Sequence, residues 1–129
     1  QLVIIHSMTR MLNLPIEIVP CDIVREKNGL AMSSRNQLLT VPEREEAGMI
    51  YGTLKYVKQT ASKTTIQECK VYVENQFRNA ENFQLEYFEI VDLYSLKPLN
   101  SWAESTQIIG CIAVRVGRVR LIDNMIIFS

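Results

Sequence analysis

The sequence predicts an α+β fold: a small antiparallel sheet of about three strands, with helices on one face. Two observations lead to this prediction. Before residue 80, apolar residues recur mainly at helical spacing, and from Phe83 onward the pattern becomes aromatic, β-branched and alternating. Helices followed by a run of strands favour α+β over an alternating α/β order. The length of 129 residues and the apolar content of 47% suit one globular unit.

The first twenty residues are predicted to form a helix and a short strand. In segment 1–13 the apolar residues fall on one helical face, and an asparagine followed by a proline ends the pattern. Ile16–Pro20 alternates and is β-branched, which predicts a strand. Because the chain opens in mid-pattern at Gln1, we expect a piece of a longer protein. Residues 1–20 would be the tail of a preceding α/β unit, and residues 21–129 a domain of their own.

Two longer helices are expected next, and each begins with a capping box. Thr40 with Glu43, and Thr65 with Glu68, have the spacing at which threonine and glutamate side chains satisfy each other's backbone N–H groups. The first helix is expected to run unbroken to Ala61. Stripes of apolar residues at helical spacing predict the buried faces of the two helices: Ala47, Ile50, Tyr51, Leu54 and Val57, then Ile66, Cys69, Val73 and Phe77.

The last third of the chain predicts the strands. Phe83–Asp92 reads as one strand, with a bulge where its alternation slips. Residues 107–128 predict a hairpin, because Gly117-Arg118 suits a two-residue turn with glycine first. Trp102 is expected to pin its loop to the core. A solvated surface is the preferred interpretation of three arginines around the turn: Arg115, Arg118 and Arg120.

Charge and cysteine content exclude several classes of protein. The net charge is zero, with 14 basic and 14 acidic side chains, so neither nucleic acid nor an anionic membrane is an expected partner. Asp123 and Asn124 look like a metal-binding pair, but nothing nearby in the sequence completes a site. The three cysteines lack metal-ligand spacing, so no metal site is expected, and buried free thiols point to the reducing cytoplasm: Cys21, Cys69 and Cys111.

A polar loop, "REKNGLAMSSRN" from Arg25 to Asn36, lies between apolar stretches. Gly29 permits a sharp turn, Ser33 and Ser34 offer hydroxyl and N–H groups, and Arg35 offers a planar fork of donors that matches phosphate geometry. Arg25 supplies a second guanidinium nearby in the sequence. These groups suit a phosphate clamp. The alternative is a solvated loop with a capping serine, which composition alone favours.

The order of residues in this loop is informative. "VREKNGLAMSSRN" resembles the ATP-binding segment of the pantothenate synthetase (pantoate–β-alanine ligase) family. The opening "QL", the stretch "NLPIEIV" and the closing "RLIDNMII" resemble further parts of that family, in order along the chain. The resemblance implies an N-terminal Rossmann-like domain, whose last helix and strand are residues 1–20, and a C-terminal α+β lid. It also implies condensation of pantoate with β-alanine, with MgATP going to AMP and pyrophosphate through a pantoyl adenylate.

The resemblance also implies roles for single residues. Ser33, Ser34 and Arg35 match the catalytic residues that contact the β- and γ-phosphates of ATP. Val24 and Met32 match positions near the nucleotide, where main-chain groups can read adenine.

The resemblance covers only part of a site. Gln1 matches the glutamine that binds pantoate, but the family's His-x-Gly-His motif and its lysine-aspartate pair are absent, and Asn28 stands where aspartate is more usual. The only histidine, His6, lies in the opening helix. We therefore expect a C-terminal lid that is inactive alone and that belongs to a homodimer when joined to the N-terminal domain. The alternatives are a non-catalytic assembly domain that kept the fold, or another adenylate-forming ligase.

Overall fold

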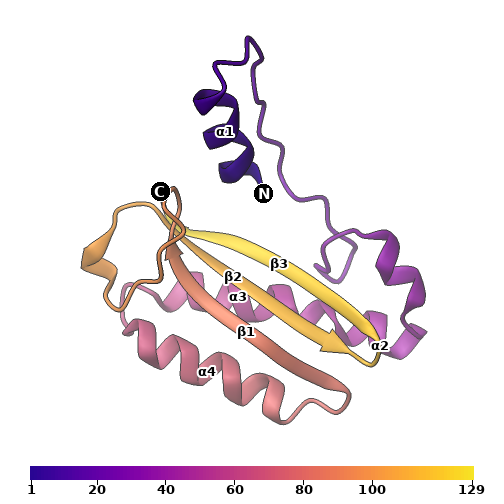
Figure 1. The fold of residues 1–129 in the computed structure, drawn as a ribbon. Coiled ribbons are helices and arrows are strands. Elements are labelled where there is room, and N and C mark those ends of the chain that lie inside the picture. Colours follow the sequence, from indigo (N-terminus) through magenta and orange to yellow (C-terminus); the bar gives the residue numbers. More distant parts are fainter.

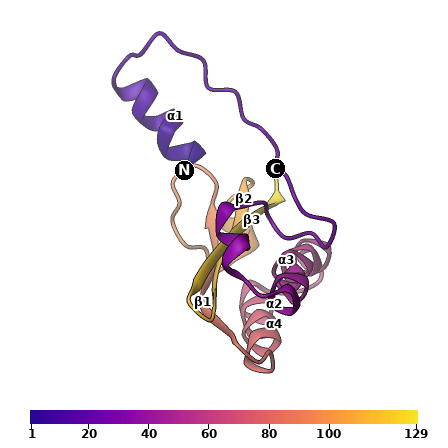
Figure 2. The same cartoon turned by 90° about the vertical axis from the view of Figure 1, so that its right-hand side faces the viewer.

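The computed structural model describes all 129 residues and confirms the α+β prediction. Its centre is a three-stranded antiparallel sheet in the order β1-β2-β3, made of Phe83–Asp92, Ile108–Val116 and Val119–Phe128. Helices α3 (Gly48–Thr60) and α4 (Ile66–Arg78) cover one face of this sheet (Figures 1 and 2). None of the helices combines the length and apolar character that crossing a bilayer requires.

The strand register follows the predicted pattern. The β1–β2 pairing shifts between Leu85 and Tyr87, which confirms the predicted bulge. The β2–β3 hairpin closes with Val116 opposite Val119, and Gly117 has a φ of +55°, which glycine adopts without steric cost. The hairpin prediction is therefore confirmed down to its turn.

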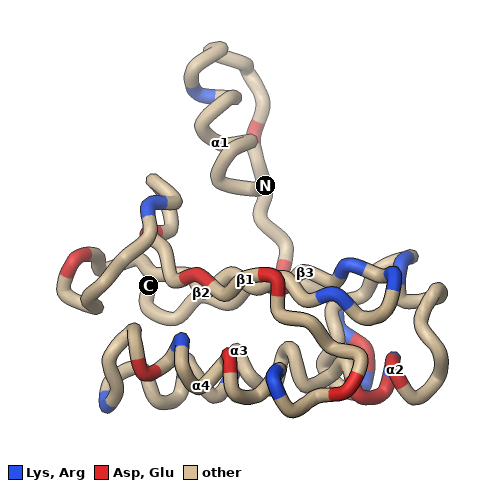
Figure 3. Tube along the Cα trace, turned by 60° about the horizontal axis from the view of Figure 1, so that its bottom comes forward, with Lys and Arg blue, Asp and Glu red and all other residues tan.

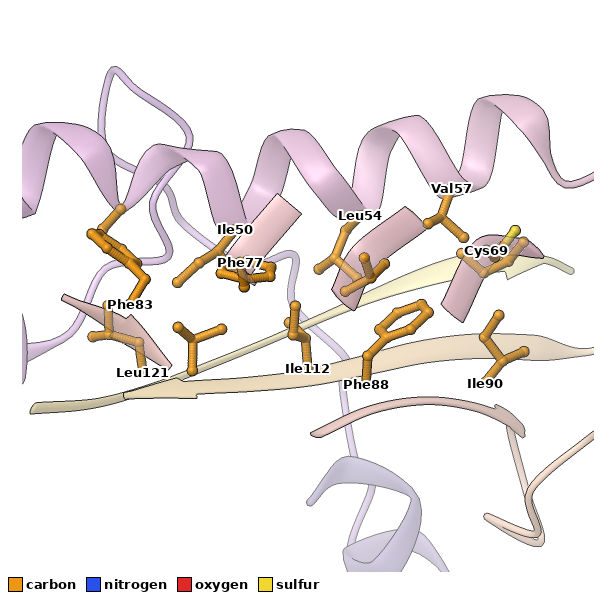
Figure 4. Close-up of a cluster of buried hydrophobic side chains, with 14 of the residues drawn as sticks. Ile50, Leu54, Val57, Cys69, Phe77, Phe83, Phe88, Ile90, Ile112 and Leu121 are labelled. Atoms are coloured by element: carbon orange, nitrogen blue, oxygen red, sulfur yellow. The ribbon is translucent and has the colours of Figure 1, made fainter. Parts of the chain in front are cut away.

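The core lies between the sheet and the two helices. Ile50, Leu54 and Val57 of α3 point at the sheet, where Phe88 and Ile112 meet them (Figure 4). These side chains are almost completely buried, and each contributes about 1.5–3 kcal/mol by leaving water. The helical stripes predicted from the sequence are buried as expected, except for Tyr51, which is half-buried.

Both capping boxes form. Thr40 accepts a hydrogen bond from the Glu43 N–H at 3.4 Å, and the Glu43 carboxylate accepts one from the Thr40 N–H at 2.8 Å. The box of Thr65 and Glu68 has the corresponding distances of 3.2 and 2.7 Å. In each box the backbone and side-chain hydrogen bonds from the threonine lower the pKa of the glutamate.

The helix predicted to run unbroken from residue 40 to Ala61 is instead two helices. α2 (Val41–Glu46) is followed by a single non-helical residue, Ala47, and α3 begins directly after it. A side chain from the polar loop binds at this break: the Asn28 amide donates to the carbonyls of Arg44 and Glu45 at 2.8 and 3.1 Å. A continuous helix would offer these carbonyls to its own backbone N–H groups, so Asn28 replaces helical hydrogen bonds with its own.

The N-terminal helix prediction is confirmed, but the strand prediction after it is wrong. α1 (Leu2–Met11) stands away from the sheet in both views (Figures 1 and 2). Ile16–Pro20 is extended and has no strand beside it, so its backbone makes no ladder. Most of the apolar side chains of α1 are exposed, and no other part of this chain covers them.

The loop between β1 and β2 is anchored as expected, whereas the cysteines are not all buried. The Trp102 indole N–H donates to the Thr64 carbonyl at 2.6 Å, and its ring meets the edge of Phe128 with centroids 5.5 Å apart. All three cysteines are free thiols, but only Cys69 is buried, and Cys21 is exposed.

Candidate functional site

The polar loop folds back on itself as a short hairpin. The Met32 N–H donates to the Val24 carbonyl at 2.9 Å, and the Glu26 N–H donates to the Leu30 carbonyl at 2.8 Å. Gly29, with a φ of +94°, makes the turn. The structure thus places Val24 and Met32, which are eight positions apart in the sequence, opposite each other across the hairpin. One backbone hydrogen bond joins these two residues, which we call the Val24–Met32 backbone pair.

The serine-arginine run follows directly after this hairpin. Ser33 caps a 3₁₀ helix (Ser34–Leu38), and its hydroxyl accepts a hydrogen bond from the Arg35 N–H at 3.2 Å. The side chains of Ser33, Ser34 and Arg35 are exposed, so they are accessible to a ligand. The alternative interpretation was thus right that a serine caps a helix here, and that serine is Ser33. This cap does not prevent phosphate binding, because the guanidinium of Arg35 has no partner within the chain.

A cavity of about 210 Å³ lies between this run and the last strand. Met32, Ser33 and Arg35 line one side of it, and β3 contributes Arg120 and Asp123 to the other. The loop therefore lies against β3 and is not surrounded by solvent on all sides. We call it the seated loop.

Arg25 is fixed by four contacts within the chain. The prediction that its guanidinium is free to bind phosphate is therefore wrong. Its guanidinium binds both carboxylate oxygens of Asp123, at 2.6 and 3.0 Å. It also donates to the Gly29 carbonyl at 3.0 Å and lies over the Tyr51 ring, 4.0 Å from the centroid. The same contacts explain Asp123, which resembled a metal ligand in the sequence and here accepts from an arginine.

A second set of contacts fixes the far end of the loop. The Glu26 carboxylate accepts from the Asn36 amide at 2.7 Å and from two nitrogens of Arg44 at 2.8 and 2.9 Å. The hydrogen bond from Arg44, followed by that from Asn36, lowers the pKa of Glu26. Asn36 also donates to the Ala31 carbonyl at 3.0 Å and is 1% exposed, while its amide oxygen has no partner. Sequence reasoning missed both Glu26 and Asn36 as parts of the site.

Gln1 lies apart from the phosphate-binding candidates. It lines a different cavity, of about 660 Å³, between the start of α1 and the open face of the sheet. Arg25 and Tyr51 border that cavity, but Ser33, Ser34 and Arg35 do not. The structure brings together the residues expected to bind ATP and leaves the residue expected to bind pantoate separate.

Charged residues cluster at one end of the molecule, around α2 and the tip of the β2–β3 hairpin (Figure 3). At the tip, Arg115 and Arg120 share the carboxylate of Glu86, at 2.6 and 2.5 Å. These half-exposed pairs agree with the solvated surface expected there. No group of three His, Cys, Asp or Glu side chains is placed to hold a metal ion.

The chain belongs to the pantoate–β-alanine ligase family, whose model matches residues 1–126. Among the relatives, a pantothenate synthetase of Azobacteroides pseudotrichonymphae is 44% identical over 97% of this chain, and one of Bacteroides thetaiotaomicron is 46% identical over 97%. The chain covers 45% and 44% of these relatives. It thus spans somewhat less than half of their length and corresponds to their C-terminal portion.

Solved structures agree with this assignment. A pantothenate synthetase from Thermus thermophilus matches 99% of this chain and 46% of its own, with a TM-score of 0.90 and 32% identity. A pantoate–β-alanine ligase from Francisella tularensis, complexed with beta-gamma ATP and beta-alanine, matches 98% of this chain and 40% of its own, with a TM-score of 0.62 and 25% identity. The resemblance seen in the sequence is therefore confirmed at the level of family and fold.

Proposed function

We propose that this chain is the ATP-facing lid of a pantoate–β-alanine ligase. The complete enzyme would join pantoate to β-alanine, with ATP going to AMP and pyrophosphate through a pantoyl adenylate. In this proposal residues 1–20 belong with the preceding Rossmann-like domain and residues 21–129 form the lid. The observation that carries the proposal is the seated loop, which presents Ser33, Ser34 and Arg35 to solvent directly beside the Val24–Met32 backbone pair.

Ser33, Ser34 and Arg35 would hold the β- and γ-phosphates. A guanidinium supplies planar, charged donors that match phosphate oxygens in pairs, and serine hydroxyls add neutral donors. Donors aimed at the departing pyrophosphate lower the barrier to adenylate formation, because negative charge builds up on it in the transition state. The exposure of these side chains and the lack of an internal partner for the Arg35 guanidinium support this role.

Val24 and Met32 would read adenine through the main chain. The Met32 N–H bonds to the Val24 carbonyl, but the reciprocal bond from the Val24 N–H to the Met32 carbonyl is not formed. One donor and one acceptor therefore remain at this end of the hairpin. An adenine edge offers the complementary pair, an amino group and a ring nitrogen.

The remaining parts of the proposal concern partners. Mg²⁺ would arrive with ATP as part of the substrate, Gln1 would contact pantoate, and the preceding domain would supply the rest of the site. The chain alone would then be inactive, because catalysis requires groups from both domains in one geometry. We also propose a homodimer for the complete protein, and a cytoplasmic location on the ground of the free thiols.

The test is AMP release from MgATP, pantoate and β-alanine. It is measured with the chain alone, with the chain plus a separately made N-terminal portion of the Bacteroides thetaiotaomicron relative, and with the two portions fused. We expect no activity from the chain alone and activity from the fused protein. A folded but inactive fused protein would contradict the proposal and favour a non-catalytic assembly domain.

The matched variants are Arg35→Ala and Arg78→Ala, which remove one exposed arginine each, in the loop and at the end of α4. Arg35→Ala should lower kcat/KM for ATP about 100-fold or more in the fused protein, the usual loss when one donor to the transition state is removed. Its melting temperature should stay near that of the parent. Arg78→Ala should change neither quantity. Equal losses of activity in both variants would contradict the role of Arg35.

A further inference from the structure

The contact between Arg25 and Asp123 joins residues 98 positions apart in the sequence. The Asp123 side chain is 3% exposed and that of Arg25 is 18% exposed, so the pair is largely shielded from water. Two parallel hydrogen bonds fix the plane of the guanidinium, and its central carbon also lies over the Tyr51 ring, 4.0 Å from the centroid. The side chain of Arg25 therefore has one orientation, set by β3 and α3 together.

A buried ion pair of this kind is weak support for stability. Taking both charges out of water offsets most of their attraction, and apolar side chains of similar volume often serve the fold equally well. Packing alone therefore does not explain this pair. A guanidinium bound to a carboxylate by two hydrogen bonds has a fixed orientation as well as a fixed distance, whereas an apolar contact fixes orientation less well.

The direction matters because of what lies next to Arg25. It directly follows Val24, and it pairs across the hairpin with Ala31, which directly precedes Met32. Its guanidinium also holds the Gly29 carbonyl at the turn. The pair with Asp123 thus fixes both strands of the hairpin and its turn against β3, and with them the main-chain groups assigned to adenine.

We propose that Arg25 and Asp123 are positioning residues for ATP: they hold the Val24–Met32 backbone pair at the place where adenine binds, without touching the nucleotide themselves. This inference rests on the proposed function and adds to it the part of the fold that orients the nucleotide. Displacements of about 1 Å in a binding group can cost 100-fold in rate. A shift of this hairpin should therefore weaken the use of ATP specifically.

The test replaces the pair by apolar residues of similar volume in the fused protein. Arg25→Met and Asp123→Leu each leave one buried charge without its partner, so each single variant should melt at a lower temperature. The double variant removes both charges and should regain most of the lost melting temperature. Its KM for MgATP should nevertheless stay at least tenfold above that of the parent, while its KM for β-alanine stays within twofold. A purely structural pair would regain the ATP KM along with the melting temperature, and that result would overturn the proposal.

Two further variants complete the test. The ion pair of Lys70 and Glu89, 2.7 Å apart, joins α4 to β1 away from the loop, and Lys70→Met with Glu89→Leu should leave the KM for MgATP unchanged. If the double variant at Arg25 and Asp123 does not fold, Asp123→Asn keeps the volume and loses the charge. It should raise the KM for MgATP at least threefold, and an unchanged KM would overturn the proposal. An inactive parent protein would instead contradict the proposed function itself, so the two failures are distinguishable.

Discussion

Replacing Gly29 by alanine should destabilise this chain by two separate effects. Gly29 has a φ of +94°, a conformation that costs an L-residue about 1–2 kcal/mol. A Cβ at this position would also lie 2.4 Å from Cδ1 of Tyr51 and 3.1 Å from its Cγ. These atoms belong to the inner part of the ring, so the whole Tyr51 side chain must move away from its packed position.

The second effect can be bounded from the contacts of Tyr51. Forcing an extra methyl group against a packed side chain costs about 1–3 kcal/mol. The ring also lies under the Arg25 guanidinium, 4.0 Å from the centroid, and this contact weakens when the ring moves. The sum of the two effects is roughly 2–5 kcal/mol, a large part of the stability of a small domain.

The assay is urea unfolding of the chain followed by far-UV circular dichroism, with Gly29→Ala made in the parent and in a Tyr51→Ala background. Without the ring, the substitution should cost only the backbone share of about 1–2 kcal/mol, so the two costs should differ by more than about 1 kcal/mol. Equal costs in both backgrounds would refute the collision. A cost below about 1 kcal/mol in the parent would refute the backbone argument too.

Three further predictions concern stability. Leu54 is 0% exposed, and Leu54→Ala should lower the free energy of unfolding by about 2–5 kcal/mol. Val71 is exposed, and Val71→Ala should lower it by less than about 1 kcal/mol; urea unfolding measures both changes. Thr65→Ala removes a capping box and should cost about 1 kcal/mol, visible as a lower urea midpoint with an unchanged slope. Hydrogen bonds from the Ser95 backbone and side chain are the main causes that lower the pKa of Asp92 to about 2. A lowered folded-state pKa gives stability that is present above the unfolded-state pKa near 3.8 and is lost as the pH falls towards 2. The difference in urea midpoint between the parent and Asp92→Asn should therefore be constant above about pH 5 and should shrink between about pH 4 and 2, and a constant difference throughout would contradict the assignment.

Local patterns in the sequence predicted those features that depend on near neighbours. The capping boxes of Thr40 and Thr65 involve residues three positions apart, and the Gly117 turn needs only its two flanking strands. The helical period of α1 was likewise sufficient to predict a helix, although nothing in this chain covers its apolar face.

Two predictions were wrong because a distant group decides the structure. Ile16–Pro20 has the alternation of a strand, but a strand also needs a neighbour to pair with, and no sheet edge lies beside it. The helix from residue 40 onward contains Gly48 next to the break, but a single glycine weakens a helix by only about 1 kcal/mol and does not by itself end it. It breaks at Ala47 because Asn28, sixteen positions before Arg44, takes the carbonyls that the helix would use.

The candidate site was predictable only in part. The residues expected to bind ATP came from the order of "MSSRN" and its resemblance to one family, and the structure places them together on one seated loop. The groups that seat the loop did not follow from any local pattern. Arg25 and Asp123 looked like a phosphate ligand and a metal ligand when each was read beside its neighbours, and only their contact across 98 positions shows that they serve each other.

That span also has a consequence for the order in which the chain folds. The sheet is a meander of consecutive strands, and its β2–β3 hairpin closes over a two-residue turn, so its pairings form across short separations. The Arg25–Asp123 contact closes most of the chain into one large ring, and its loop-closure entropy is correspondingly greater. Pairing of the three strands therefore does not depend on residues 25–36 being fixed against β3 beforehand. In the native state, the backbone amides of residues 25–36 should open and exchange with solvent while the sheet stays closed.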